Sequence, residues 1–142
     1  MKLLRIAVGV LVAAYGLFCL YPILTNALFK LGALHPAGEA LRLTPLWDAT
    51  PWWQLALWTA IVSLYGATAV RLVRGQPALG FYVVALFLDA ARWWLMQSST
   101  AYQQVFTPAE LEFDYVLLLG TALAGVTIWW IEKRPPTEPL SA

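Results

Sequence analysis

The sequence predicts an all-α integral membrane protein: one bundle of four transmembrane helices with both termini on the cytoplasmic side. Hydrophobic residues make up 61% of the 142 residues and charged residues 12%, whereas soluble domains contain about 45–50% and about 25%. The mean hydropathy is +0.66. So few charged side chains cannot cover a surface that faces water. Most of the surface must therefore face lipid.

Four segments are long and apolar enough to cross a hydrocarbon layer of roughly 30 Å, which takes about 20 helical residues. They cover residues 6–24, 52–70, 78–96 and 115–131. We expect one membrane domain, 1–132, with an outer loop at 26–51. A cytoplasmic tail at 133–142 contains three prolines and is predicted to be disordered. The first span is longer than the core of a signal peptide, so we expect it to be retained.

The basic residues predict the orientation, because cytoplasmic loops carry an excess of Lys and Arg. With the N-terminus inside, six basic residues lie on the cytoplasmic side: Lys2, Arg5, Arg71, Arg74, Lys133 and Arg134. Only Lys30 and Arg42 lie outside. Six tryptophans fall near the predicted span ends, where an aromatic belt would lie: Trp52, Trp53, Trp93, Trp94, Trp129 and Trp130. We expect an integral protein of a bacterial inner (plasma) membrane.

Local signals predict where several helices begin and end. Gly75 is suited to a left-handed helix end, and Pro77 to the start of the next helix. Thr107 followed by Pro108 and Glu110 predicts a capping box at the start of the fourth helix. The stretch 40–47 of the outer loop predicts a short helix on the membrane surface. Pro22 predicts an end or a kink in the first span.

Small residues predict where helices approach each other closely. Gly9, Ala13 and Gly16 in the first span, and Gly120 and Ala124 in the fourth, are spaced as small residues are at membrane helix contacts.

The third span contains an acidic and a basic residue, Asp89 and Arg92. Ionisable groups at this depth cost about 2.5–3.5 kcal/mol on insertion scales, so each needs a partner or a wet cavity. Three residues apart on a helix, the two side chains can pair. They continue a stripe that is predicted to face other helices: Ala78, Tyr82, Ala85, Asp89, Arg92 and Met96.

Counting residues from the inner span ends predicts what the pair meets. On the second span the count reaches Thr59, followed by Ser63 one turn further in. On the fourth span it reaches Thr121 and, on the first, Leu17, with Tyr21 one turn further out. The candidate ligand- or partner-binding residues are Asp89, Arg92, Tyr82, Thr59, Ser63 and Thr121.

Two interpretations of the pair remain open. Asp89 and Arg92 can hold helices together, with Arg92 also able to extend toward the outer headgroups. Alternatively, they form a site for a polar ligand, a proton, a lipid headgroup or a polar side chain of a partner.

Other functions are disfavoured by composition. A net charge of +1 argues against a nucleic-acid partner. One cysteine and one histidine exclude the usual Cys/His zinc sites, and no span contains a histidine to hold haem. The sequence contains no phosphate-binding loop and no nucleophile motif. We therefore expect no catalytic residue, metal or cofactor.

The organisation resembles that of small four-helix DoxX-like membrane proteins. The resemblance rests on residues 4–9 (LRIAVG), Tyr21-Pro22 closing the first span, Arg92 late in the third, and residues 109–111 (AEL) at the entry to the fourth. It implies a four-helix membrane bundle, which in some members serves as a subunit.

We expect a small non-catalytic protein that serves as an accessory, assembly or stabilising subunit of a larger membrane complex. Its partners would be the lipid bilayer and other membrane subunits or a second copy. The alternative is a small transport or ligand- or lipid-binding protein that uses a polar pocket around Asp89 and Arg92.

Overall fold

The computed structural model describes residues 1–134. This part of the chain contains seven helical segments and no strand. The segments are α1 (Lys2–Lys30), η1 (Gly38–Leu43), α2 (Thr44–Ala49), α3 (Trp52–Val73), α4 (Leu79–Gln97), α5 (Thr100–Val105) and α6 (Pro108–Lys133). The four longest helices are long and apolar enough to span a membrane. Each of them overlaps one of the four predicted spans. The predicted tail lies outside the described residues from position 135 onward.

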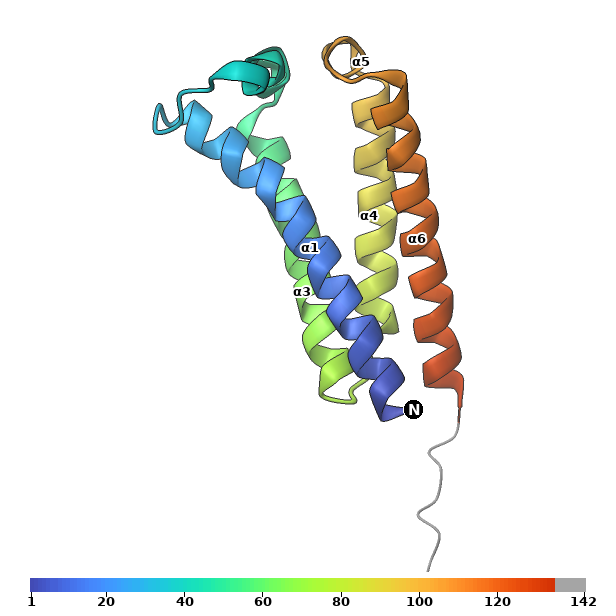
Figure 1. Ribbon diagram of the computed structural model, residues 1–142. Coiled ribbons are helices and arrows are strands. Elements are labelled where there is room, and N and C mark those ends of the chain that lie inside the picture. Colours follow the sequence, from blue (N-terminus) through green and yellow to red (C-terminus); the bar gives the residue numbers. More distant parts are fainter. Residues whose placement is uncertain (135–142) are drawn as a thin grey trace, which may run out of the picture.

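The four long helices form two pairs that diverge along the bundle (Figure 1). α1 packs along α3, and α4 packs along α6, while α3 and α4 connect the pairs. We call the end that carries η1, α2 and α5 the loop end. We call the opposite end, with the N-terminus and the last turn of α6, the terminal end. The pairs are furthest apart at the loop end.

Glycines allow the close contact between α1 and α3, as predicted. A Cβ atom at Gly9 would lie 3.2 Å from the backbone oxygen of Ala69, and one at Gly16 would lie 3.5 Å from the Cβ of Tyr65. On α6 the prediction of Gly120 was wrong, because nothing lies within 4 Å of its Cβ position. Gly125 makes the contact instead, where a Cβ would lie 3.1 Å from the Tyr82 ring.

A carboxylate of α6 caps the start of α4. Glu132 Oε1 accepts hydrogen bonds from the backbone N–H groups of Ala78 (2.6 Å) and Leu79 (3.1 Å). The first N–H groups of a helix have no partner within it, so this contact satisfies two of them. It also ties α4 to α6 at the terminal end.

Several predicted boundaries were right. Gly75 has a φ of 72°, the left-handed conformation expected after α3. Thr107 and Glu110 form the predicted capping box. The stretch predicted as a short helix is helical, in η1 and α2.

Other boundaries need correction. α1 continues through Pro22 to Lys30 rather than ending near residue 24. A proline removes one helical hydrogen bond, but neighbouring turns can maintain the helix. α4 begins at Leu79, two residues after Pro77. α5 was not predicted, since six residues are too few to show a helical period.

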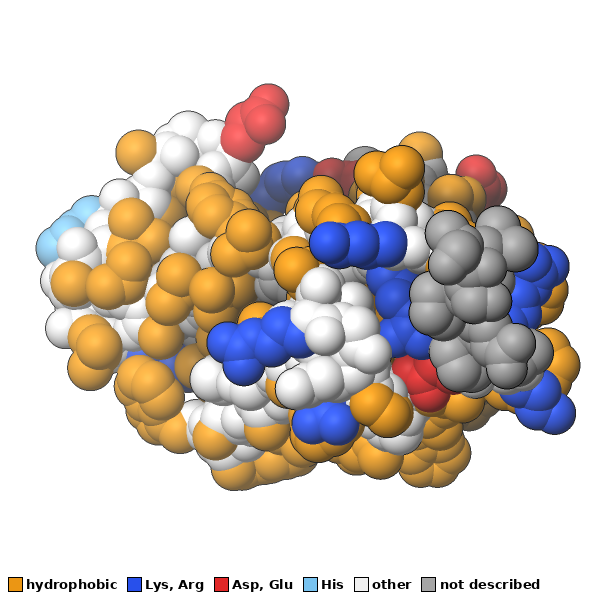
Figure 2. Space-filling model, turned by 90° about the horizontal axis from the view of Figure 1, so that it is seen from below, with side chains coloured by type: hydrophobic (Ala, Val, Ile, Leu, Met, Phe, Trp, Pro, Cys, Tyr) orange, Lys and Arg blue, Asp and Glu red, His pale blue; other side chains and the backbone are white. Residues whose placement is uncertain are grey.

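The surface has the distribution expected of a membrane bundle. Large apolar side chains are exposed on all four long helices. Figure 2, a view of the terminal end, shows Lys and Arg side chains gathered there and apolar side chains around the flanks. The six basic residues predicted to share one side of the membrane all lie near this end.

Replacing Gly9 with leucine should destabilise the bundle by about 1–3 kcal/mol, because the added carbons meet the backbone of α3 and force α1 away. Gly66→Leu is the matched control, since Gly66 is an exposed helical glycine with nothing within 4 Å of its Cβ position. The free energy of unfolding in a detergent titration measures both. Equal losses would show that α1 and α3 are not in close contact at Gly9.

Candidate functional site

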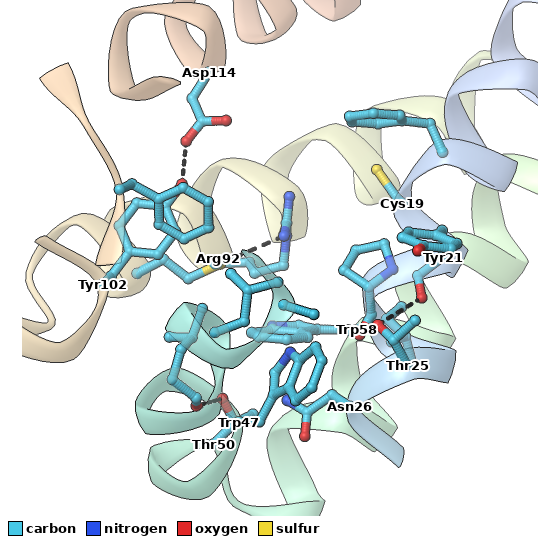
Figure 3. Close-up of a pocket in the computed structure, with 18 of the residues that line it drawn as sticks. Cys19, Tyr21, Thr25, Asn26, Trp47, Thr50, Trp58, Arg92, Tyr102 and Asp114 are labelled. Carbon is cyan, nitrogen blue, oxygen red and sulfur yellow. Dashed lines mark hydrogen bonds between the residues drawn. The ribbon is translucent and has the colours of Figure 1, made fainter. Parts of the chain in front are cut away.

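A cavity of about 520 Å³ lies between the two helix pairs toward the loop end. Its wall is built from α1, α3, α4 and α6, together with residues of the 31–51 loop and α5. Figure 3 shows 18 of the residues that line it. The lining is mainly aromatic and aliphatic, with a few polar groups among them.

Asp89 and Arg92 form the predicted ion pair at the wall of this cavity. Arg92 donates from Nε to Asp89 Oδ1 at 2.7 Å, and its Nη2 lies 2.7 Å from the same oxygen. The Asp89 side chain is 4% exposed and that of Arg92 is 21% exposed. The acid is therefore the more deeply buried partner, and the guanidinium borders the open space.

Two tyrosines complete the environment of Asp89. Tyr15 of α1 donates to Oδ2 at 2.7 Å, and Tyr65 of α3 donates to the same oxygen at 3.1 Å. Their rings meet edge to face with centroids 5.2 Å apart. The carboxylate thus accepts hydrogen bonds from three helices, which satisfies a charge that would be costly to bury alone.

The count along the spans missed these tyrosines because it ignored the direction of side chains. The Cα–Cβ bonds of a helix tilt toward its N-terminus. α3 begins at the loop end, so Tyr65 leans toward that end, whereas Asp89 on α4 leans the opposite way. The two side chains therefore meet between positions that a residue count places at different depths.

Arg92 remains inside the bundle and does not extend to the outer surface. Its guanidinium carbon lies 5.7 Å from the centre of the Trp58 ring, within the range of a cation–π contact. Its Nη1 donates to Met96 Sδ at 3.5 Å. These contacts hold the cation over the cavity wall.

Thr59 and Ser63 do not face the pair, which corrects the sequence prediction. Both are exposed, and their hydroxyls donate to the backbone oxygens of Leu55 and Thr59 in their own helix, each at 2.8 Å. The opposite face of α3 points inward and places Trp58 and Tyr65 there. Depth along the span does not determine which face of the helix a residue occupies.

Tyr82 and Thr121 are brought together, but one layer closer to the terminal end. The Tyr82 hydroxyl donates to the backbone oxygen of Thr121 at 2.5 Å and joins α4 to α6. The Tyr82 ring also packs against Tyr65, with centroids 5.7 Å apart. The Thr121 hydroxyl donates to Leu118 in its own helix at 2.8 Å. Neither Tyr82 nor Thr121 lines the cavity.

The first span meets the pair through residues other than those predicted. Leu17 is 67% exposed and points away. Tyr21 is 72% exposed, although it borders the cavity. Cys19, between them, lines the cavity together with Tyr15.

At the loop end, an ion pair joins η1 to α6. Arg42 of η1 donates to both carboxylate oxygens of Glu110 on α6, at 2.6 and 3.1 Å. The same guanidinium donates to the backbone oxygen of Val105 at 3.4 Å. Nearby, Tyr102 donates to Asp114. Burial and this hydrogen bond raise the pKa of the Tyr102 phenol, so it keeps its proton at neutral pH.

Three residues that line the cavity carry a buried polar atom with no hydrogen-bond partner among residues 1–134. One is Trp93, whose Nε1 is unpartnered. The other two atoms belong to residues that are themselves buried: Oδ1 of Asn26, in a residue 2% exposed, and Nε1 of Trp58, in a residue 6% exposed. Both residues line the cavity (Figure 3). Buried polar atoms are nearly always hydrogen-bonded, so these two point to a bound polar group.

In the described part of the chain, no group of three or more His, Cys, Asp and Glu side chains is placed to hold a metal ion. Comparison of the chain with protein-family models, curated proteins and solved structures finds no match.

Asp89→Asn should lower the free energy of unfolding by about 3–5 kcal/mol, because it leaves Arg92 without a countercharge in an apolar setting. Arg92→Gln should cost a similar amount. The double variant should lose clearly less than the sum, because neither charge then remains uncompensated. Detergent unfolding of the four proteins measures this coupling. Costs that simply add would show that the pair is not an energetic unit.

Proposed function

We propose that this protein is a small multi-pass membrane protein that binds one small molecule in the cavity between its helix pairs. The proposal rests on a cavity of about 520 Å³ whose lining residues carry three buried, unpartnered polar atoms. Ligand sites typically measure about 300–1,000 Å³ and combine an apolar lining with a few polar groups. The Asp89–Arg92 pair adds a fixed dipole to this wall.

The distribution of basic residues supports a placement in the membrane. Lys and Arg gather at the terminal end, and this is the side that membrane proteins keep in the cytoplasm. We therefore propose that the terminal end faces the cytoplasm and the loop end faces outward, in a bacterial inner membrane. The cavity then lies in the outer half of the bilayer.

As a second proposal, the protein is an accessory subunit of a larger membrane complex. The exposed face of α3, which points away from the bundle, supports this proposal. Thr59, Ser63 and Gly66 form a row of small residues on this exposed face. Both hydroxyls are already bonded within the helix, so another helix could approach closely without leaving them unpaired. Such a face is suited to a neighbouring membrane subunit.

The cavity proposal predicts that Cys19→Trp removes the bound molecule. Cys19 lines the cavity, and an indole in its place occupies ligand space. Protein purified from native membranes would be extracted with organic solvent and the extract compared by mass spectrometry. The wild-type extract should contain a molecule that the variant lacks.

Leu17→Trp is the matched control, because Leu17 lies on the same helix and is 67% exposed. It should retain the molecule as the wild type does. Size-exclusion profiles verify that all three proteins fold. Identical extracts from the three would contradict binding in the cavity.

The subunit proposal predicts that Ser63→Leu combined with Gly66→Leu releases a stoichiometric partner. The larger side chains prevent another helix from approaching α3 closely. Tagged purification in mild detergent, followed by size exclusion, measures the complex. Leu123→Ile, at an exposed position on α6, serves as the control and should retain the partner. A wild-type protein that elutes alone would overturn this second proposal.

A further inference from the structure

Two of the three unpartnered atoms at the cavity, those of the buried residues Asn26 and Trp58, have complementary roles. Asn26 Oδ1 accepts a hydrogen bond and Trp58 Nε1 donates one. They come from α1 and α3, and neither has a partner within the described residues. A hydroxyl both donates and accepts, so the same kind of group suits both atoms.

Three of the four Asp and Arg side chains that line the cavity are held in ion pairs. Asp89 is paired with Arg92, and Arg42 with Glu110. Asp114 accepts a hydrogen bond from Tyr102. An anionic head group would be repelled by Asp114 and would have to compete for the two paired arginines, whereas a neutral group disturbs none of these contacts.

The cavity continues into a shallower groove on the side of the bundle. This groove, of about 350 Å³, lies between α1 and α6. Its lining includes Phe18, Phe106 and Asp114, which also line the main cavity. Phe18 and Phe113 are 56% and 52% exposed there. An apolar chain can therefore extend from the cavity to the flank that we propose faces lipid.

These observations together define a class of ligand. We infer that the cavity takes a neutral, lipid-soluble molecule with a hydroxyl head group, which lies between Asn26 and Trp58. The apolar body of the molecule occupies the aromatic cavity and the groove between α1 and α6. This inference rests on the proposed function of the cavity and specifies its ligand.

Three probes with the same twelve-carbon chain test the head group: 1-dodecanol, dodecyltrimethylammonium and dodecanoate. The full chain is placed in lipid nanodiscs, and each probe is titrated against the labelling of Cys19 by N-ethylmaleimide. Cys19 is the only cysteine of the sequence and lines the cavity. The readout is the probe concentration in the lipid that halves the labelling rate. A Cys19→Ala, Leu17→Cys protein controls for effects on the bilayer, because Leu17 is exposed on the flank.

1-Dodecanol should protect Cys19 at the lowest concentration and should leave Leu17→Cys labelling unchanged. Trp58→Phe and Asn26→Leu should each raise the half-protecting concentration about three- to tenfold, the effect of one lost hydrogen bond. Trp52→Phe makes the same substitution at an exposed position of α3 and should change nothing.

Two results would overturn the inference while leaving the cavity proposal standing. One is stronger protection by either charged probe. The other is protection by 1-dodecanol that both Trp58→Phe and Asn26→Leu leave unchanged. If no probe protects Cys19, the ligand class is wrong. The extraction experiment with Cys19→Trp then decides independently whether the cavity binds anything.

Discussion

The burial of one carboxylate constrains most of this structure. Asp89 lies in the interior of a helix that is otherwise almost entirely apolar, where an uncompensated charge would cost several kcal/mol. Its two oxygens accept hydrogen bonds from Arg92, Tyr15 and Tyr65. Those donors lie on α4, α1 and α3. Satisfying the charge therefore requires three helices to be in register at one level of the bundle.

The contacts on either side of Asp89 differ in kind. Toward the terminal end, Gly9 lets α1 and α3 touch, while Tyr82 and Glu132 join α4 to α6. Toward the loop end, the inward side chains are large aromatics and the pairs diverge. The Arg42–Glu110 pair bridges the two halves there. The polar layer thus separates a close-packed end from a hollow one.

This arrangement connects the two interpretations of Asp89 and Arg92. The pair has a structural role, because its hydrogen bonds join three helices. The same pair lies at the cavity wall, with the guanidinium over Trp58. In our proposals, the polar contacts for a ligand come from Asn26 and Trp58, whose hydrogen-bonding capacity is unused within the described residues. The ion pair would then hold the wall in place, and the neutral groups would bind the head group.

The sequence alone was sufficient to identify the four long apolar helices and the central pair. Composition and run length identify four spans, since the apolar length needed to cross a bilayer is a property of the chain itself. The spacing of Asp89 and Arg92 predicts their contact, and the Thr107 capping box is equally local.

Only the tertiary structure decided which residues of the other helices meet the pair. Thr59 and Tyr65 lie on different faces of one helix, and helix rotation and side-chain tilt place Tyr65 at Asp89 while Thr59 faces outward. Rotation and tilt depend on packing between helices distant in sequence, so the cavity and its unpartnered atoms emerge only when the chain is folded.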